Sequence, residues 1–283
     1  MFESIGRSWE LVKASWQILS RDRKLLVFPV LSGIVTLAVV ASFILPLILT
    51  GAVLGSVAGP APWYVLLFLF YVVSYFVAIF FNTALVTCVY SLLQGRETSI
   101  GDGLSHAVRH AGSILLWAVI AATVGILLRV IGERTGIIGR IAVSLVGGIW
   151  SLVTIFVVPV LVLEDKGVVD AMKESVALFR KTWGESVVGS VSIGLIFGAI
   201  LILGVLPVIA SALTGSVAVI LLAVALFVLL LVVVGVVASA MQGVFVVALY
   251  TYAKTGVVPH PFDRGMVEKA FVPKEPAFGA GNI

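Results

Sequence analysis

Three polar side chains recur at four-residue intervals in one short stretch, "SIGDGLSHAVRHAG" at residues 99–112. They are Asp102, His106 and His110, and on a helix they would share one face. A carboxylate and two imidazoles at this spacing could bind a divalent metal ion, and a His–Asp pair could respond to pH near neutrality. The stretch also allows a structural alternative, because an aspartate just before a helix accepts hydrogen bonds from free backbone N–H groups.

The neighbouring residues favour the structural alternative. Apolar residues of this stretch form one stripe, and the two histidines lie on the opposite side. A second stretch of similar pattern, "GVVDAMKESVALF" at residues 167–179, keeps an aspartate, Asp170, but has no histidines at the matching positions. We therefore interpret Asp102 and Asp170 as helix N-caps, and His106 and His110 as residues of a solvated face. A metal or pH-responsive site at the two histidines is the alternative.

Four further polar side chains lie inside long apolar segments. Asn82 and Thr83 fall in "FVAIFFNTALVTC" at residues 76–88, and Thr154 and Gln242 occupy similar positions in two later segments. A polar side chain at membrane depth needs a partner or lines a cavity, so these residues could converge on a hydrophilic centre. Alternatively they hydrogen-bond across helices and hold a bundle together, at roughly 0.6 kcal/mol for each bond.

Small residues at four-residue spacing form another group in the last two apolar segments. Such faces allow helices to approach one another closely. They suit packing within the chain and self-association equally well. The residues of this helix-packing group are Gly194, Gly198, Gly235, Ser239 and Gly243.

The elements that must position these residues are membrane helices. The chain has 283 residues, of which 61% are hydrophobic and 11% charged, whereas soluble domains carry about 25% charged residues. Only helices let a single chain satisfy its backbone hydrogen bonds in lipid without closing a barrel. The sequence therefore predicts an all-α integral membrane protein, with a break at Gly235 left open and spans at about 25–49, 63–93, 114–131, 141–163, 187–213 and 217–252.

The spans are expected to form three hairpins, each preceded by an amphipathic helix on the cytoplasmic surface. These surface helices are predicted at 1–24, about 101–112 and about 168–183, within a six-span bundle at 25–255 that a tail follows at 256–283. With the N-terminus inside, only Arg129, Arg134 and Arg140 of the 18 lysines and arginines lie outside. The excess of positive charge on cytoplasmic segments predicts that both termini of this multi-pass protein are cytoplasmic.

Several longer stretches are similar to those of a known family. They include "SWELVKASWQILSRDRKLLVFPVLS" (8–32), "YFVAIFFNTALV" (75–86), "SIGDGLSHA" (99–107), "IWSLVTIFVVPVLVLED" (149–165) and "FRKTWGESVVG" (179–189). With these stretches the chain resembles a family of uncharacterised prokaryotic six-span proteins, domain of unknown function 6159. The resemblance extends over most of the chain up to about Gly198, and the last third is similar mainly in hydropathy. It implies six spans in a prokaryotic cytoplasmic membrane, and it supplies no activity or catalytic residue.

The motifs in the sequence favour a role other than catalysis. The sequence has no phosphate-binding loop, nucleophile elbow or zinc signature, so we expect no enzyme activity, no cofactor, no bound metal and no nucleic-acid partner. The favoured function is an accessory or assembly component acting through helix packing and interfacial helices. Its partners would be membrane lipid and a homo-oligomer or larger membrane complex. The alternative is a channel or carrier for a small solute or lipid, with a polar centre near Asn82, Thr154 and Gln242.

Overall fold

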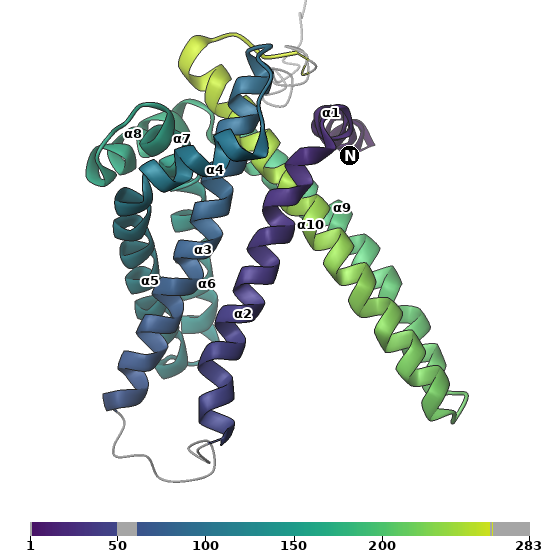
Figure 1. The fold of residues 1–283 in the computed structure, drawn as a ribbon. Helices are drawn as coiled ribbons and strands as arrows, with labels where there is room; N and C mark the ends of the chain where they lie inside the picture. Colours follow the sequence, from purple (N-terminus) through teal and green to yellow (C-terminus); the bar gives the residue numbers. More distant parts are fainter. Residues whose placement is uncertain (1, 50–60, 261, 263–283) are drawn as a thin grey trace, which may run out of the picture.

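Helices are the only regular secondary structure in the described part of the chain in the computed structural model (Figure 1). The structure describes residues 2–49, 61–260 and 262; the side chains of residues 2–11, 61–64 and 183–192 are not described. Six segments are long and apolar enough to cross a membrane, which confirms the all-α six-span prediction. They are Arg23–Leu49, Val65–Leu93, Ala111–Arg134, Ile137–Leu163, Ile193–Ala212 and Val217–Thr255.

The spans are built from eight helices. In chain order these are η1 (Arg23–Leu26), α2 (Val27–Leu49), α3 (Ala61–Leu93), α5 (Ala111–Arg134), α6 (Ile137–Val153), α7 (Val157–Leu163), α9 (Trp183–Ala212) and α10 (Val217–Thr255). Three further helices lie at one end of the bundle, at the top of Figure 1: α1 (Phe2–Arg21), α4 (Ile100–Arg109) and α8 (Val168–Lys181). We call this end, where α10 also finishes, the polar side. The three helices lie where the sequence predicts surface helices, and the tail beyond residue 262 falls outside the described residues.

The fourth and sixth spans differ from each other in continuity. The fourth is interrupted between Val153 and Val157, so that α6 and α7 are separate helices. The sixth is one unbroken helix through Gly235. A glycine keeps its backbone hydrogen bonds in a helix, and in lipid those bonds have no substitute. The break therefore lies in the fourth span and not at the glycine of the sixth.

Helix α10 is longer than one membrane crossing requires. Its 39 residues correspond to about 58 Å, against about 30 Å for the hydrocarbon core. Figure 1 shows α10 running obliquely beside α9, away from α2, α3, α5 and α6, and continuing past them on the polar side. It ends at Gly256, whose left-handed φ of 71° and N–H bond to Tyr252 close the helix. The tilt and the extension together account for its length.

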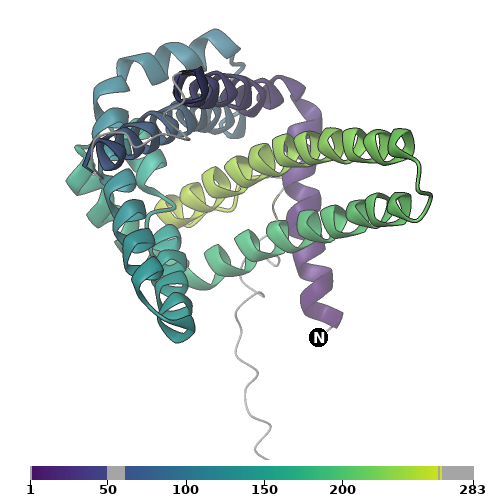
Figure 2. The ribbon, with the colours of Figure 1, turned by 90° about the horizontal axis from the view of Figure 1, so that it is seen from below.

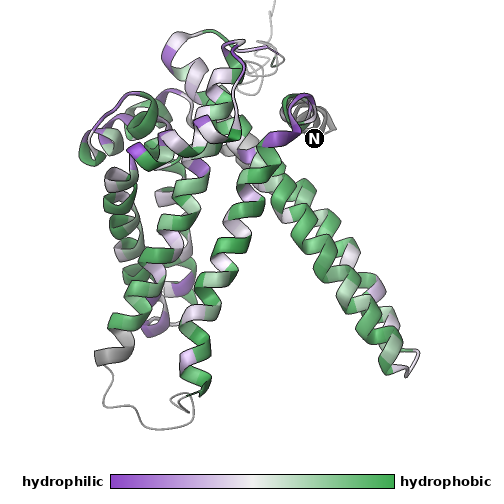
Figure 3. Ribbon diagram, in the orientation of Figure 1, coloured by the Kyte–Doolittle hydropathy of each residue, from purple (hydrophilic) through white to green (hydrophobic). Residues whose placement is uncertain are grey.

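The buried core lies toward the polar side. Residues 240–250 of α10 are almost entirely buried there, and α10 packs against α9, α3 and α1. The outer half of α10 is covered only by α9 on one side, and most of its large apolar residues are exposed. Figure 2 shows α1 crossing both α10 and α9. Figure 3 shows hydrophobic residues along the spans, hydrophilic residues gathered on the polar side, and a smaller hydrophilic group at the opposite end, where α5 meets α6.

Candidate functional site

A groove lies between α2 and the middle of α10, with a volume of about 510 Å³. Its walls are largely apolar and open toward the surface of the spans, where lipid would lie. The groove is set in the polar-side half of the membrane, since its residues on α2 begin just after the first turn at Val27. Its lining residues are Pro29, Val30, Ser32, Gly33, Ile34, Thr36, Leu37, Leu231, Val232, Gly235, Val236 and Ser239.

A second cavity of about 170 Å³ continues this groove toward α3. The two share Pro29, Ser32 and Ser239, so they adjoin one another. The inner cavity also reaches Asn82, which lies about 16 Å along α3 from its polar-side end. Together they form an apolar groove with a polar inner wall, which we call the α2–α10 groove. No charged side chain lines either cavity.

The polar side chains of the α2–α10 groove have no hydrogen-bond partner among the described residues. These side chains are Ser32 and Thr36 of α2, Asn82 of α3 and Ser239 of α10. A polar side chain at membrane depth pairs with another polar group or lines a cavity, and these four line the groove. Their amide and hydroxyl groups can both donate and accept hydrogen bonds. They are therefore available to a ligand with uncharged polar atoms.

Two glycines determine the width of the groove and a third marks where it closes. A Cβ placed on Gly33 or Gly235 would meet no atom within 4 Å. A Cβ on Gly243, two turns along α10, would lie 2.5 Å from Cδ2 of Leu85 on α3. Helix α10 is thus pressed against α3 at Gly243 and separates from its neighbours toward Gly235, and the groove fills the resulting wedge.

Only part of the predicted polar centre meets in this groove. Asn82 lines it, whereas Thr83 is buried beside it with no partner for its hydroxyl among the described residues. The Thr154 hydroxyl donates to the Trp150 carbonyl at 2.7 Å and does not reach the groove. Gln242 lies on α10 near Gly243, outside the residues that line either cavity. Ser32, which the sequence does not single out, joins Asn82 in their place.

The predicted helix-packing residues also separate into two kinds. Gly243 makes the close contact expected of the group. Gly194, Gly198 and Gly235 face open space, and Ser239 lines the groove. Within the described chain these three glycines therefore make no close helix contact, and the alternative that they serve self-association stays a prediction.

A buried serine forms hydrogen bonds with the backbone at the break in the fourth span. Ser175 of α8 is 0% exposed; its hydroxyl donates to the Val153 carbonyl at 2.7 Å and accepts from the Phe156 N–H at 3.1 Å. These two backbone groups lose their helical partners where α6 ends and α7 begins. The sequence gives no signal for this contact, because Ser175 lies 19 and 22 residues from its partners.

The histidine stretch forms contacts between helices and not the solvated face that we expected. The Nε2 atom of His106 lies 2.7 Å from the Val162 carbonyl at the end of α7. His110 places Nδ1 2.9 Å from the His106 carbonyl and Nε2 2.6 Å from Oδ1 of Asp165. Both ring nitrogens of His110 thus lie within hydrogen-bond distance of an oxygen atom. His110 holds the pKa of Asp165 below its ordinary value, and Asp165 has a left-handed φ of 50°.

The predicted N-cap assignments require a correction. Ser99 is the N-cap of α4, and Asp102 is its third residue: Ser99 Oγ accepts from the Asp102 N–H, and the Asp102 carboxylate accepts from the Ser99 N–H. This capping box lowers the pKa of Asp102 through its bonds to Ser99. In α8 the N-cap is Gly167, and Asp170 lies in the first turn, 3.5 Å from Lys173. The negative charge of Asp170 interacts favourably with the positive end of the helix dipole, but Asp170 is not the N-cap.

Four charged residues form a network between the start of α8 and the end of α10. Lys166 lies 2.9 Å from Glu164 and 2.7 Å from Glu174, and Lys254 contacts the same two carboxylates. Hydrogen bonds to Lys166 and Lys254 lower the pKa of Glu174 to about 2. Burial alone would raise the pKa of Glu164, but its bonds to Lys166, Tyr250 and Lys254 outweigh this effect and lower it. The network fastens α10 to the α7–α8 connection.

Across the residues for which the structure gives a placement, no three His, Cys, Asp or Glu side chains gather as a metal site would require. Asp102 bonds to Ser99 and does not join His106 and His110. The arrangement that remains is a lipid-facing groove with uncharged hydrogen-bonding groups, above which charged residues hold the helices together.

Comparison with known proteins identifies a family for this chain. No curated protein and no solved structure matches the chain. A family model described as a family of unknown function (DUF6159) matches residues 61–260. The match includes the last third, where the sequence resemblance was mainly one of hydropathy, and it begins after the stretch at 8–32. The chain therefore belongs to the family of unknown function DUF6159.

Proposed function

We propose that this protein carries or presents a lipid with an uncharged polar group, which it binds in the α2–α10 groove. The observation that carries this proposal is the continuity of an apolar groove with a cavity whose polar side chains have no partner among the described residues. An acyl or isoprenoid chain would lie along the apolar walls. Its hydroxyl, ester or amide group would bond to Asn82, Ser32 and Ser239.

The chemistry of the lining defines the ligand class. The lining residues are amides, hydroxyls and hydrocarbons, and a charged group would be costly at this depth without a charged partner. A small hydrophilic solute would leave the larger apolar groove unused. A neutral lipid such as a diacylglycerol satisfies both parts of the site.

The orientation of the chain supports entry from the cytoplasmic leaflet. With the polar side in the cytoplasm, only Arg129, Arg134 and Arg140 among the lysines and arginines that the structure describes lie on the other side, as the positive-inside rule requires. The groove then opens to the inner leaflet of a prokaryotic cytoplasmic membrane. Lipid would enter sideways between α2 and α10 without crossing the charged surface.

The proposal is tested with a photoreactive diacylglycerol added to phosphatidylcholine vesicles that contain the purified protein. Cross-links are expected on the α2 and α10 residues of the groove. Gly33→Leu and Gly235→Leu fill open space within it and should remove most of this labelling. Gly148→Leu is the matched control, because Gly148 is an exposed glycine of α6 with equally open surroundings. Equal labelling in all three variants, or labelling spread evenly over the exposed helices, would contradict the proposal.

A second candidate function is the accessory or assembly role, which a different surface of the protein supports. Gly194 and Gly198 of α9 leave open space beside them, and large apolar residues around them are exposed. A helix of a second copy or of a larger membrane complex could pack there. Chemical cross-linking in vesicles tests this: Gly198→Leu should abolish a cross-linked dimer or complex, while Gly148→Leu should retain it. A wild-type chain that stays monomeric in the membrane would remove this candidate.

A further inference from the structure

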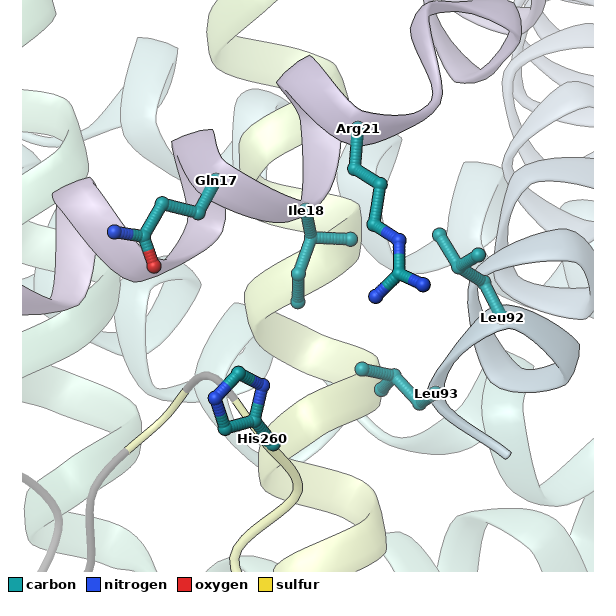
Figure 4. A pocket seen from close by; sticks show the side chains of 6 residues that line it. All are labelled: Gln17, Ile18, Arg21, Leu92, Leu93 and His260. Atoms are coloured by element: carbon teal, nitrogen blue, oxygen red, sulfur yellow. The ribbon is translucent and has the colours of Figure 1, made fainter. Parts of the chain in front are cut away.

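A third cavity lies on the polar side, away from the α2–α10 groove. It has a volume of about 130 Å³, and Figure 4 shows the six side chains that line it. They come from three parts of the chain: Gln17, Ile18 and Arg21 from α1, Leu92 and Leu93 from the end of α3, and His260 from the segment after α10. We call it the α1 pocket.

The α1 pocket carries positive charge without a balancing carboxylate in its lining. Arg21 extends from the last turn of α1 so that its guanidinium points into the space between Ile18 and Leu92, and the ring of His260 borders the same space (Figure 4). Arg21 makes no ion pair or hydrogen bond with any residue the structure describes. The nearest acidic residue along the chain, Asp22, instead accepts from the Lys24 N–H. An unpaired guanidinium is thus available to an anion.

The donors and walls of the α1 pocket suit one kind of anion. A guanidinium presents two parallel N–H groups that match the oxygens of a phosphate. The Gln17 amide and the His260 ring add further donors. Three apolar side chains, Ile18, Leu92 and Leu93, border the same space and reduce the access of water, which strengthens a charged hydrogen bond.

The place of the pocket in the fold brings it to lipid headgroups. Arg21 precedes the exposed Arg23 and Lys24 of η1, where the first span begins. Basic pockets at such a boundary bind the phosphates of anionic lipids. A soluble phosphate could reach the same donors from the aqueous side, since the pocket is lined in part by exposed residues.

We propose that the α1 pocket is a binding site for a phosphate group, held by Arg21 with Gln17 and His260. Its occupant would join α1 to the end of α3 and to the segment that follows α10. Because a ligand that binds only the folded state raises stability, occupancy should raise the unfolding temperature. This proposal does not depend on the α2–α10 groove.

The test uses the full-length protein in nanodiscs of phosphatidylcholine, with two titrations. One adds phosphatidylglycerol to the discs, and the other adds inorganic phosphate to discs without it. Retained lipid is counted by native mass spectrometry, and the unfolding temperature is followed in both titrations. Arg21→Gln should lower the apparent affinity about tenfold or more, because it removes a bidentate charged bond. Arg21→Lys should lower it less, since it keeps the charge and loses the fork.

Arg23→Gln is the matched control, because Arg23 is an exposed arginine two residues away that does not line the pocket. Stabilisation by phosphatidylglycerol alone, lost in Arg21→Gln and kept in Arg23→Gln, supports the proposal with a lipid as the source. Stabilisation by inorganic phosphate with the same dependence on Arg21 supports it with a soluble source. Equal effects of the two substitutions, or no binding in either titration, would overturn it. Gly235→Leu should leave both titrations unchanged, which separates this result from the fate of the proposed function.

Discussion

Two regions of this molecule treat polar groups within the spans in opposite ways. At the break in the fourth span, Ser175 gives a partner to each of two backbone groups that the helices leave free. In the α2–α10 groove, Asn82, Ser32 and Ser239 have no partner in the described chain. Both regions lie among apolar residues, so the difference is not one of composition. It separates polar groups that stabilise the fold from polar groups that the fold leaves available.

Helix α10 shows a related contrast between a tightly packed part and an open part. At Gly243 it touches Leu85 so closely that no side chain fits, and at Gly235 it faces open space. A tight contact at one point and a diverging path beyond it produce a wedge-shaped groove without any break in the helix. Substitutions at matched positions in the two regions should therefore affect stability in one and ligand binding in the other.

The largest expected effect is on stability, at the break. Ser175→Ala leaves the Phe156 N–H and the Val153 carbonyl buried without partners, at about 1–3 kcal/mol for each group. We expect the free energy of unfolding to fall by about 2–4 kcal/mol, measured by steric trapping or denaturant titration in detergent. Ser105→Ala is the control, because the Ser105 hydroxyl is exposed and bonds only within α4, donating to the Asp102 carbonyl and accepting from the Arg109 guanidinium. Equal stability of the two variants would show that Ser175 does not support the break.

The next effect compares the two glycines of α10. Gly243→Ala forces Leu85 or the helix to move, and overpacking of this kind costs about 1–3 kcal/mol. Gly235→Ala adds a methyl group to open space and should change the free energy of unfolding by less than about 0.5 kcal/mol. The double variant Gly243→Ala with Leu85→Val should recover part of the loss, since the neighbour then gives room. Equal losses at Gly243 and Gly235 would show that α10 is not pressed against α3 as described.

A smaller effect concerns ligand binding alone. Asn82→Leu removes an amide that has no partner in the described chain, so stability should be unchanged or slightly raised. A hydrogen bond across membrane helices contributes about 0.6 kcal/mol and at most about 1.7 kcal/mol. The affinity for a diacylglycerol should therefore fall about 3- to 20-fold, measured by competition for the photoreactive probe. Thr154→Val, at a hydroxyl bonded to the Trp150 carbonyl, should leave this affinity unchanged, and an equal loss there would argue against the groove.

The spans could be predicted from the sequence because hydropathy and length determine them locally. The groove could not, since it depends on where α2, α3 and α10 meet, and Ser32 and Ser239 lie more than 200 residues apart. Asn82 could be found because an amide in a long apolar segment is rare. Its predicted companions Thr154 and Gln242 came from an alignment of spans, which fixes depth and not direction.

The contacts of His106 and His110 could not be predicted from the sequence either. The helical wheel gives the face of α4 on which His106 and His110 lie, but it does not show that α7 and Asp165 come to cover that face. In the same way, Asp102 is clearly placed near a helix start, whereas only the backbone geometry assigns the cap to Ser99. Local patterns predict which groups lie together on one element, and packing decides what they meet.

The smallest expected effect lies in the charged network. The pKa of Glu174 falls from an ordinary 4.5 to about 2 in the folded protein, so its contribution to stability is present above pH 4.5 and is lost as the pH falls toward 2. Because the network is partly exposed, we expect Glu174→Gln to cost only about 1 kcal/mol at neutral pH. The variant should also flatten the decline of the unfolding temperature between pH 4.5 and 2. Asp170→Asn removes the exposed pair with Lys173 and should do neither. A wild-type decline that persists unchanged in Glu174→Gln would show that other carboxylates cause it and that the network does not fasten α10 to α8.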